Sequence, residues 1–370
     1  MKILHINSYY NGSKFYKNLY DKQIEEGQDI DVFVPVSYAN KELNFDFGSY
    51  TTVSRNHNKF DRYIFHIKHY KIYKDIVKKY QINNYGTIHA HSLFSNGYIA
   101  MKIKESYGIP YIVAVRNTDV NLFFAKMPHL RKMGIKILKE ANRIIFLSES
   151  YKDYVFTEYI PKNLRDDLLA KVSIIPNGID NFWFKNIGNS KQLLSKEKLN
   201  LLFIGDINRN KNVTTTIKAI EILIKKGYRI EFTVVGEIRD QDIYKQIRNI
   251  QYVKYISPKS MKELRKIYLN NDIFVMPSIK ETFGLVYAEA MSQGLPIVYS
   301  RGQGFDRQFT EGEVGYSVSN NSAEEISNRI QQLIGDYEVI SKRCVNNVGK
   351  FNWQKISQEY IQLYYQIKDH

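Results

Sequence analysis

Short apolar runs alternate along the chain with longer stretches in which apolar residues recur every three or four positions. Short runs are typical of buried strands and the longer stretches of amphipathic helices, so the pattern predicts strand-helix-strand units around parallel sheets. In the first half the pattern predicts helices at 15–26 and 63–80, and strands at 2–7, 30–36, 87–90, 111–115, 143–147 and 172–176.

At 185–198 the composition changes, because Asn, Gly, Ser and Lys replace the apolar runs. Such a stretch is typical of a linker. The alternation then restarts, with strands expected at 199–204, 229–235, 273–276 and 296–299, and helices at 213–226, 260–270, 285–293 and 323–335. The 370 residues are therefore expected to form two α/β domains, 1–185 and 186–350. The aromatic-rich end, 351–370, is expected to be a helix that stays on the second domain or returns to the first.

Composition narrows the function classes. A single cysteine cannot form an internal disulfide, and no apolar stretch reaches the ~20 residues of a membrane span, so we expect a cytoplasmic protein, at most peripheral on the inner membrane face. The 53 Lys and Arg exceed the 38 Asp and Glu, a formal charge of +15. This surplus favours phosphate-bearing partners, although an A+T-rich coding bias explains it equally. No nucleic-acid-binding signature accompanies the charge, so nucleic acid is not expected as a partner.

The segment 277–291 carries the most specific signal for chemistry. A strand ends at its start, a loop with Glu281 and Gly284 follows, and a helix begins near Leu285 with Glu289 inside it. Backbone N–H groups at a helix start bind anions, and glycine permits close approach. Two carboxylates with this spacing could hold hydroxyl groups at two ends of a sugar nucleotide. Taken alone, they are better explained as a capping acid and a solvated helix residue.

A second strand-to-helix loop, 203–212, places Arg209 and Lys211 after the turn at Gly205. Cations in such a loop can neutralise a diphosphate leaving group. Taken alone, the loop is better explained as solvated basic surface.

Together these stretches resemble the retaining glycosyltransferases of family 4, which have the GT-B fold, over nearly the whole chain. Pro-Ser-x-x-Glu-x-Phe-Gly at 277–284, with Glu289 beyond it, is similar to that family's paired-glutamate motif. The segment 205–211 resembles its Gly-Arg-x-x-x-x-Lys loop. Pro-Asn-Gly-Ile-Asp at 176–180 and Gly-Leu-Pro-Ile-Val at 294–298 match further landmarks of the family in the same order.

The resemblance implies two Rossmann-like domains facing each other across a cleft, and transfer of a sugar from a nucleotide sugar with retention of configuration. By the same resemblance, Glu289 binds the ribose, Glu281 binds the transferred sugar, and Lys211 stabilises the departing diphosphate. The backbone groups that would hold the sugar and phosphates belong to Thr282, Phe283, Gly284 and Leu285.

In the first domain, Asn11-Gly12-Ser13 resembles the family's glycine loop, in which Gly12 would face the donor phosphates. His89 and His91 stand where the family has a histidine pair, and His91 is implied to point into the cleft as a catalytic residue. Without the resemblance, the two histidines are equally a metal pair or ordinary strand-end residues.

Two positions depart from the family. Asp206 stands at the place of a phosphate-binding arginine, for which Arg209 is expected to substitute. Arg116 stands where many members have a cleft histidine. Arg116 and Asp119 are expected to contact the sugar or the acceptor, or to pair with one another.

Basic residues concentrate in two stretches of the first domain, 59–79 and 126–143. Such stretches suit an anionic membrane surface, or are core-facing helices with a solvated basic side. Because the family binds acceptors in this domain, a lipid-linked saccharide is the expected acceptor. The Asp-x-Asp triplets at 29–31 and 240–242 permit a metal-dependent hypothesis, but cations and helix termini already supply charge, so no metal and no cofactor are expected.

The leading hypothesis is a retaining hexosyltransferase that uses a UDP-sugar in the synthesis of a surface polysaccharide or related glycan. A catalytically silent GT-B subunit that binds a partner or glycoprotein is the alternative from another class. A nucleic-acid-binding role is the third hypothesis, and a sugar-nucleotide epimerase on the same fold is a further one.

Overall fold

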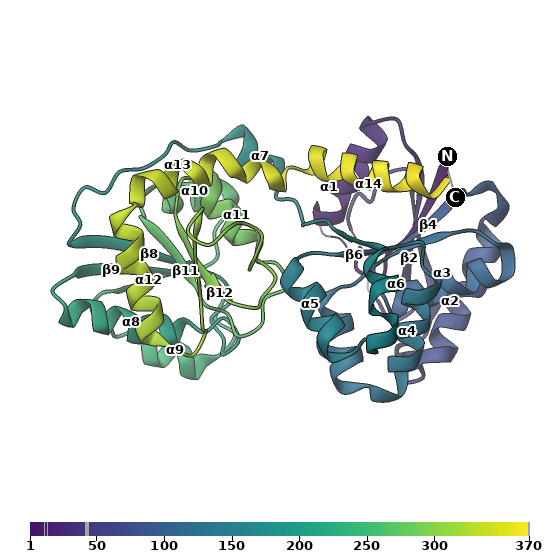
Figure 1. Cartoon of the computed structure of the whole chain (residues 1–370), viewed down its shortest axis with the longest axis horizontal. Helices are drawn as coiled ribbons and strands as arrows, with labels where there is room; N and C mark the ends of the chain where they lie inside the picture. The colour runs from purple at the N-terminus through teal and green to yellow at the C-terminus, as the bar shows by residue number, and fades with distance from the viewer. Residues whose placement is uncertain (11, 13, 41–43, 369–370) are drawn as a thin grey trace. The chain divides into compact units, whose positions relative to one another are not determined.

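The computed structural model describes the chain apart from residues 11, 13, 41–43 and 369–370. It divides the chain into two compact units. The first unit comprises 1–147, 152–178 and 353–370, and the second comprises 148–151 and 179–352. Each unit is a parallel sheet covered by helices, which confirms the predicted fold class of two Rossmann-like α/β domains (Figure 1).

The first unit contains a seven-stranded parallel sheet in the order β3-β2-β1-β4-β5-β6-β7. Its strands are β1 (Lys2–Ile6), β2 (Asp29–Ser37), β3 (Thr51–His57), β4 (Thr87–Ala90), β5 (Tyr111–Ala114), β6 (Arg143–Phe146) and β7 (Val172–Ile174). Its helices are α1 (Lys14–Glu25), α2 (Phe65–Lys79), α3 (Ser95–Tyr107), α4 (Arg131–Glu140), α5 (Glu149–Glu158), α6 (Arg165–Leu169) and α14 (Trp353–Lys368). Short helical turns join them: η1 (Lys59–Tyr63), η2 (Ile82–Asn84), η3 (Asp119–Phe124), η4 (Pro128–Leu130) and η5 (Lys162–Leu164).

The second unit contains a six-stranded parallel sheet in the order β10-β9-β8-β11-β12-β13. Its strands are β8 (Lys198–Ile204), β9 (Arg229–Val235), β10 (Val253–Ile256), β11 (Ile273–Met276), β12 (Ile297–Ser300) and β13 (Gly315–Val318). Its helices are α7 (Asn181–Lys185), α8 (Val213–Lys225), α9 (Gln241–Ile247), α10 (Met261–Leu269), α11 (Leu285–Ser292), α12 (Ala323–Gly335), α13 (Tyr337–Asn347) and the turn η6 (Val348–Phe351).

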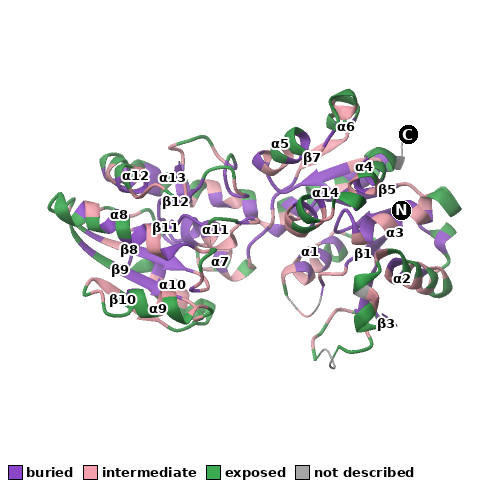
Figure 2. Cartoon of the chain, turned by 90° about the horizontal axis from the view of Figure 1, so that it is seen from below, coloured by how far each residue is buried: buried purple, intermediate pink, exposed green. Residues whose placement is uncertain are grey.

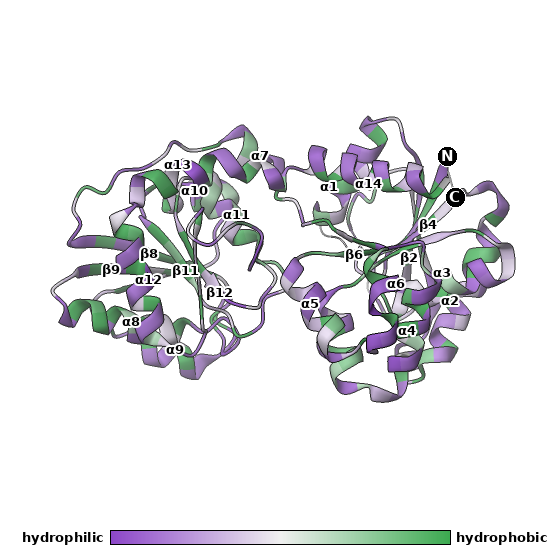
Figure 3. Ribbon diagram, viewed as in Figure 1, coloured by the Kyte–Doolittle hydropathy of each residue, from purple (hydrophilic) through white to green (hydrophobic). Residues whose placement is uncertain are grey.

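The core of each unit lies on the two faces of its sheet. Every residue of the central strands β4, β5 and β11 is buried, as the purple strands of Figure 2 show. β11 is one of the hydrophobic segments in Figure 3. A parallel sheet covered on both faces produces continuous apolar runs such as Ile-Phe-Val-Met in β11 and Tyr-Ile-Val-Ala in β5, whereas β4 (Thr-Ile-His-Ala) is buried although two of its residues are polar.

The strands that the apolar pattern did not predict are β3, β10 and β13, and each lies at an edge of its sheet. β3 has the sequence Thr-Thr-Val-Ser-Arg-Asn-His, in which polar residues dominate. An edge strand has a neighbour on one side only and tolerates polar side chains, so its sequence lacks the apolar run of a central strand.

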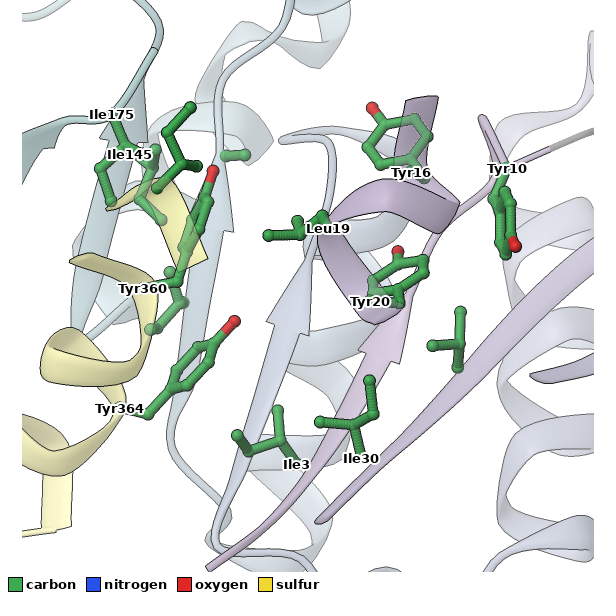
Figure 4. Close-up of a cluster of buried hydrophobic side chains, with 14 of the residues drawn as sticks. Ile3, Tyr10, Tyr16, Leu19, Tyr20, Ile30, Ile145, Ile175, Tyr360 and Tyr364 are labelled. Carbon is green, nitrogen blue, oxygen red and sulfur yellow. The ribbon is translucent and has the colours of Figure 1, made fainter. Parts of the chain in front are cut away.

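The last helix, α14, belongs to the first unit. It contacts α1, and its residues Trp353, Tyr360 and Tyr364 join the hydrophobic cluster formed by α1, β1 and β2. Figure 4 shows Tyr360 and Tyr364 projecting from α14 toward the strands. Of the two placements that the sequence left open for this segment, the structure has the return to the first unit.

The chain passes into the second unit at 178–179, before the linker expected at 185–198. The short helix α7 accounts for the difference. Its Trp183 is fully buried against Tyr268 of α10, with ring centroids 5.5 Å apart, so this helix is part of the second unit's core.

Both sheets reverse their strand order at one place. In the first, β1 lies between β2 and β4, and in the second, β8 lies between β9 and β11. Loops that leave two adjacent parallel strands toward opposite sides open a crevice at the carboxyl ends of these strands, where α/β sheets bind ligands. Ligand-binding sites are therefore expected at the loops after β1 and β4 in the first unit, and at the loops after β8 and β11 in the second.

Candidate active site

In the second unit, the reversal point brings together the two loops that the sequence singled out. Backbone and side-chain groups of Asn210 bond to Ile279 and Lys280. The side chain of Asn212, which precedes α8 in a left-handed conformation (φ 59°), donates to the carbonyl oxygen of Pro277 at 2.9 Å. These bonds join the loop after β8 to the loop after β11, although about 70 residues separate them in sequence.

Lys211 and Glu281 are in direct contact at this junction. The Lys211 ammonium lies 2.5 Å from Oε2 of Glu281, and the Glu281 side chain is nearly buried. Ser278 donates to the same oxygen at 3.3 Å, and the backbone N–H of Thr282 donates to Oε1 at 3.1 Å. A cation and a carboxylate held side by side at the end of the sheet can bind a phosphate and a sugar hydroxyl at adjacent points.

The loop that carries Glu281 leads into α11 through Gly284. Gly284 has φ +74°, and a Cβ at this position would lie 2.3 Å from the Tyr287 ring, so the turn requires glycine. The N-cap residue of α11 is Gly284, which has no side chain to cap the helix. A helix start without a side-chain cap offers its N–H groups and the positive end of its dipole to an anion.

The other residues expected in this loop have distinct surroundings. Phe283 is buried, with its ring 5.4 Å from that of Phe351, and therefore anchors the loop through its side chain. Thr282 is closely packed through its backbone, since a Cβ at Gly304 would lie 1.8 Å from the Thr282 carbonyl oxygen. Leu285 is the first residue of α11.

Glu289 lies on the second turn of α11, where Tyr268 of α10 donates to its Oε2 at 3.2 Å. Burial raises the pKa of the Glu289 carboxyl to about 7. A carboxyl with this pKa changes charge near neutral pH, so the strength with which it binds a ligand hydroxyl should change with pH.

Asp206, at the place of the family's arginine, has a cation beside it. The Arg239 Nε lies 3.7 Å from the Asp206 carboxylate, while Nη2 of Arg239 contacts Glu237 at 2.6 Å. Arg209, expected to substitute, is exposed and has no ion-pair partner among the residues described.

Arg239 was missed by the sequence reasoning. It follows β9, the strand beside β8, and the bridge between Ile207 and Ile238 joins the loops after these two strands. The signal was available in Gly236-Glu237-Ile238-Arg239, a charged segment directly after a predicted strand.

In the first unit, the loop after β1 contains Gly12 with φ +106°, a conformation that favours glycine. Its neighbours in the expected glycine loop, Asn11 and Ser13, lie outside the described residues. Gly12 is therefore placed next to the reversal point, and its contact with donor phosphates stays a prediction.

His91, which follows β4, is fully buried within the first unit. Its Nε2 lies 3.0 Å from Nδ1 of His5 and 3.2 Å from the Tyr20 hydroxyl. The reason is that α1 covers this end of the sheet and brings Tyr20 over the histidines. A catalytic role for His91 stays a prediction.

His5, His89 and His91 could be suspected of holding a metal, because one nitrogen from each lies within 4.8 Å of the others. The rings of His89 and His91 are stacked, with centroids 4.1 Å apart and planes 20° apart. Nδ1 of His89 bonds to the Tyr364 hydroxyl at 2.7 Å, whereas Nε2 of His5, Nε2 of His89 and Nδ1 of His91 have no hydrogen-bond partner among the described residues. We call these three residues the histidine cluster.

Asp119 is fully buried, and its carboxylate accepts the backbone N–H groups of Leu93, Phe94 and Arg116 at 2.9–3.0 Å. Burial raises its pKa to about 6, although these three bonds favour the charged form. The carboxylate thus holds the start of α3 and the segment after β5 in place.

The Arg116 side chain bonds to the Tyr360 hydroxyl and donates from Nε to the His91 carbonyl oxygen at 3.4 Å. Its guanidinium forms no ion pair among the described residues, since Asp119 is engaged by backbone amides. A partly buried arginine without a carboxylate partner is suited to an anionic group of a ligand.

Comparison with known proteins agrees with this geometry. Residues 13–181 match Glycosyltransferase Family 4, and residues 186–350 match the glycosyl transferases group 1, so the two matches cover nearly the whole chain. The chain belongs to the family 4 glycosyltransferases. The family expected from the motifs is thereby confirmed, and with it the general activity of sugar transfer.

Relatives of this family 4 glycosyltransferase include an uncharacterized glycosyltransferase of Methanocaldococcus jannaschii, 24% identical over 89% of this chain and 92% of its own. The capsular polysaccharide biosynthesis glycosyltransferase CapM of Staphylococcus aureus is 27% identical over 60% of this chain and 59% of its own.

Two solved structures show the same fold. Sucrose-phosphate synthase from Thermosynechococcus elongatus has a TM-score of 0.75 at 18% identity, covering 99% of both chains. HepE of Anabaena, in complex with UDP, has a TM-score of 0.70 at 15% identity and covers 99% of this chain and 100% of its own. Within the described part of the chain, no helix combines the length and apolar character needed to cross a membrane.

Proposed function

We propose that this glycosyltransferase transfers a sugar from a UDP-sugar to a saccharide acceptor with retention of configuration, in the synthesis of a surface polysaccharide. The observation that carries the proposal is the contact of Lys211 with Glu281 at the reversal point of the second sheet, beside the uncapped start of α11. A silent binding subunit would have no need to hold a cation and a carboxylate together at this position.

Cleavage of the bond between a sugar and a diphosphate requires stabilisation of negative charge on the leaving group. Lys211 and the N-terminus of α11 supply positive charge from the protein, and Arg209 and Arg239 lie on the neighbouring loops. On this proposal the reaction needs no metal ion, because the chain itself neutralises the diphosphate. Activity in excess EDTA equal to activity without it is the expected result.

The proposed donor and pathway draw on the relatives. HepE is solved with UDP, and CapM is named for capsular polysaccharide synthesis. A lipid-linked saccharide diphosphate is the proposed acceptor, because Arg116 in the first unit forms no ion pair among the described residues and could bind an anionic group.

The test is to incubate the purified protein with UDP-, GDP- and ADP-sugars and to measure nucleotide release and thermal stabilisation. We expect release and stabilisation with one or more UDP-sugars. Stabilisation without release in the presence of candidate acceptors would support the silent subunit, and no response to any nucleotide sugar would refute the proposal.

Donor binding is expected to depend on pH through Glu289. Ribose hydroxyls donate to a carboxylate, so binding requires the ionised form, which is lost as the pH falls through about 7. Between pH 8 and pH 6 the ionised fraction falls about tenfold, and the affinity for an intact UDP-sugar should fall by about the same factor. Calorimetric titration of the donor at both pH values measures this.

Glu289→Gln is the matched variant, because its side chain has the same shape and does not titrate. It should bind the donor more weakly at pH 8 and with little change between pH 8 and 6. The same tenfold loss in Glu289→Gln would show that another group causes the pH dependence.

A further inference from the structure

The segment formed by η1 and α2 exposes large apolar side chains to solvent. The exposed fraction is 76% for Phe60, 71% for Tyr63, 55% for Ile64, 44% for Ile67 and 58% for Tyr70. We call these five residues the α2 face. Monomeric proteins seldom expose so many large apolar groups in one short segment unless another surface covers them.

The helix α2 has apolar residues on two opposite sides. His69, Ile72 and Ile76 are buried against the unit. At 100° per residue, Ile67 and Tyr70 lie on the opposite side, together with Lys74. Figure 2 shows much of α2 as exposed. Because the packed side already holds the helix on the unit, the apolar residues on the outer side are not needed for folding.

Positive charge accompanies the α2 face. Lys59, Lys74 and Lys78 are exposed and form no ion pair among the described residues, and the Lys74 ammonium lies 5.5 Å from the centre of the Tyr70 ring. The two acids of the segment are occupied, Asp61 by Lys71 at 2.8 Å and Asp75 by Lys79 at 3.5 Å. The outer side of α2 is therefore both apolar and cationic.

A groove extends the α2 face toward the edge strand β3. It has a volume of about 380 Å³ and is lined by Tyr38, Arg55, Asn56, Tyr70, Lys71, Lys74 and Asp75. Tyr38 is 58% exposed. A groove lined by two aromatic rings and by the cations of Arg55 and Lys74 suits a phosphate headgroup.

The second basic stretch, 126–143, does not expose large apolar side chains as the α2 face does. Gly134, Ile137 and Leu138 of α4 are buried, and none of the exposed large apolar side chains among the described residues lies in this stretch. Its lysines are cations on a helix whose apolar side is inside. The structure thus separates two stretches that the sequence treated alike.

We propose that the α2 face binds the surface of an anionic phospholipid bilayer. Interfacial aromatic and aliphatic side chains enter the headgroup region, and lysines beside them attract acidic lipids. A second copy of the chain is a poorer occupant, because a two-fold contact would set the same cations against each other. Membrane binding would bring the enzyme to a lipid-linked acceptor, and in this respect the proposal rests on the proposed function. The binding itself can be tested without measuring sugar transfer.

The test is flotation of the full chain with vesicles of phosphatidylcholine, with and without phosphatidylglycerol. Binding to the anionic vesicles is expected, with weaker binding to the neutral ones and at high salt. Each cation near an acidic surface contributes about fivefold in partitioning, so Lys59→Gln/Lys74→Gln/Lys78→Gln should weaken binding about 100-fold. Ile67→Ser/Tyr70→Ser should weaken it at least about tenfold.

Two control variants match these changes. Lys126→Gln/Lys132→Gln/Lys139→Gln removes the same charge from the stretch around α4, and Leu194→Ser/Val339→Ser removes exposed apolar groups from the second unit. Both should bind as the unaltered chain does. Unchanged melting temperatures would show that the variants fold.

Equal binding by the α2-face variants and the controls would overturn the proposal, as would absence of binding to anionic vesicles. Concentration-dependent dimerisation that is lost in Ile67→Ser/Tyr70→Ser would overturn it in favour of an interface between copies. UDP-sugar cleavage measured without lipid should be equal in all variants. Failure of that cleavage alone would refute the proposed function and leave the membrane proposal standing.

Discussion

Replacement of Glu281 by glutamine, or of Lys211 by methionine, is expected to lower the rate of sugar transfer by about 100- to 1000-fold. The Lys211 ammonium and the Glu281 carboxylate are 2.5 Å apart, so each group also orients the other. Loss of Lys211 removes charge stabilisation from the departing diphosphate, and loss of the Glu281 charge removes the acceptor for a sugar hydroxyl. The measurement is kcat/KM for nucleotide release with the donor found in the nucleotide-sugar panel.

Lys280→Ala is the control for this experiment, because Lys280 is next to Glu281 and its side chain is exposed. It should retain activity within a few-fold of the unaltered chain. Melting temperatures should show that all three variants fold. Activity near the normal level in both Glu281→Gln and Lys211→Met would contradict the site assignment.

Mild acid is expected to unfold the first unit before the second. Burial lowers the pKa of His5 and His69 to about 3 and of His57 to about 4. Burial also lowers the pKa values of His89 and His91 well below the usual range, and neighbouring histidines and Arg116 act in the same direction. The segments of the second unit contain no histidine.

The sign of the effect follows from proton binding. In the unfolded chain these histidines bind protons below about pH 6.5, whereas the folded unit keeps them neutral to lower pH. Stability is therefore fully present above pH 6.5 and declines as the pH falls, by up to about 1.4 kcal/mol per pH unit for each histidine.

A buried acid in the first unit partly opposes this loss of stability at low pH, and buried acids in the second unit act in the opposite direction. Asp119 has its pKa raised to about 6, so it adds stability to the first unit as the pH falls, but it is one group against five. In the second unit, burial raises the pKa of Glu289 to about 7 and also raises that of Asp272. Both therefore favour the folded second unit as the pH falls from neutral.

Hydrogen exchange at pH 7.5 and 5.5, corrected for intrinsic rates, distinguishes the two units without any mutation. Peptides from β1 and β4 should lose protection at the lower pH, while those from β8 and β11 keep it. His69→Gln, which removes one titrating group outside the histidine cluster, should shift the loss to lower pH. Loss of protection in the second unit first, or in neither unit down to pH 5, would contradict the prediction.

Local patterns in the sequence were sufficient for most of the fold. β9, β11 and α12 have the predicted boundaries, because buried parallel strands and amphipathic helices each have their own periodicity. β3, β10 and β13 were not predicted because edge strands are constrained by a single neighbour. The linker between the units was predicted at 185–198, after the observed transition at 178–179. The reason is α7, which lies among polar residues in the sequence but is anchored in the second unit by the buried Trp183.

The candidate site divides in the same way. Glu281, Lys211 and Gly284 stand in motifs whose residues are close together in the chain, so the sequence could propose them. Arg239 beside Asp206 and Tyr268 on Glu289 come from distant segments and required the structure. The burial of His91 also depends on another element, since Tyr20 of α1 covers it.

The sequence by itself determined the family, the two α/β units and the identity of the loop residues, because these depend on short-range periodicity and on motifs within a few residues. Only the tertiary structure decided which loops meet, since the strand order places β8 beside β11 and so brings Lys211 to Glu281. The tertiary structure also decided which of the two basic stretches exposes large apolar side chains: 59–79 does, and 126–143 does not among the described residues. The two sides of α2 have similar sequence patterns, and packing against the sheet buries only one of them.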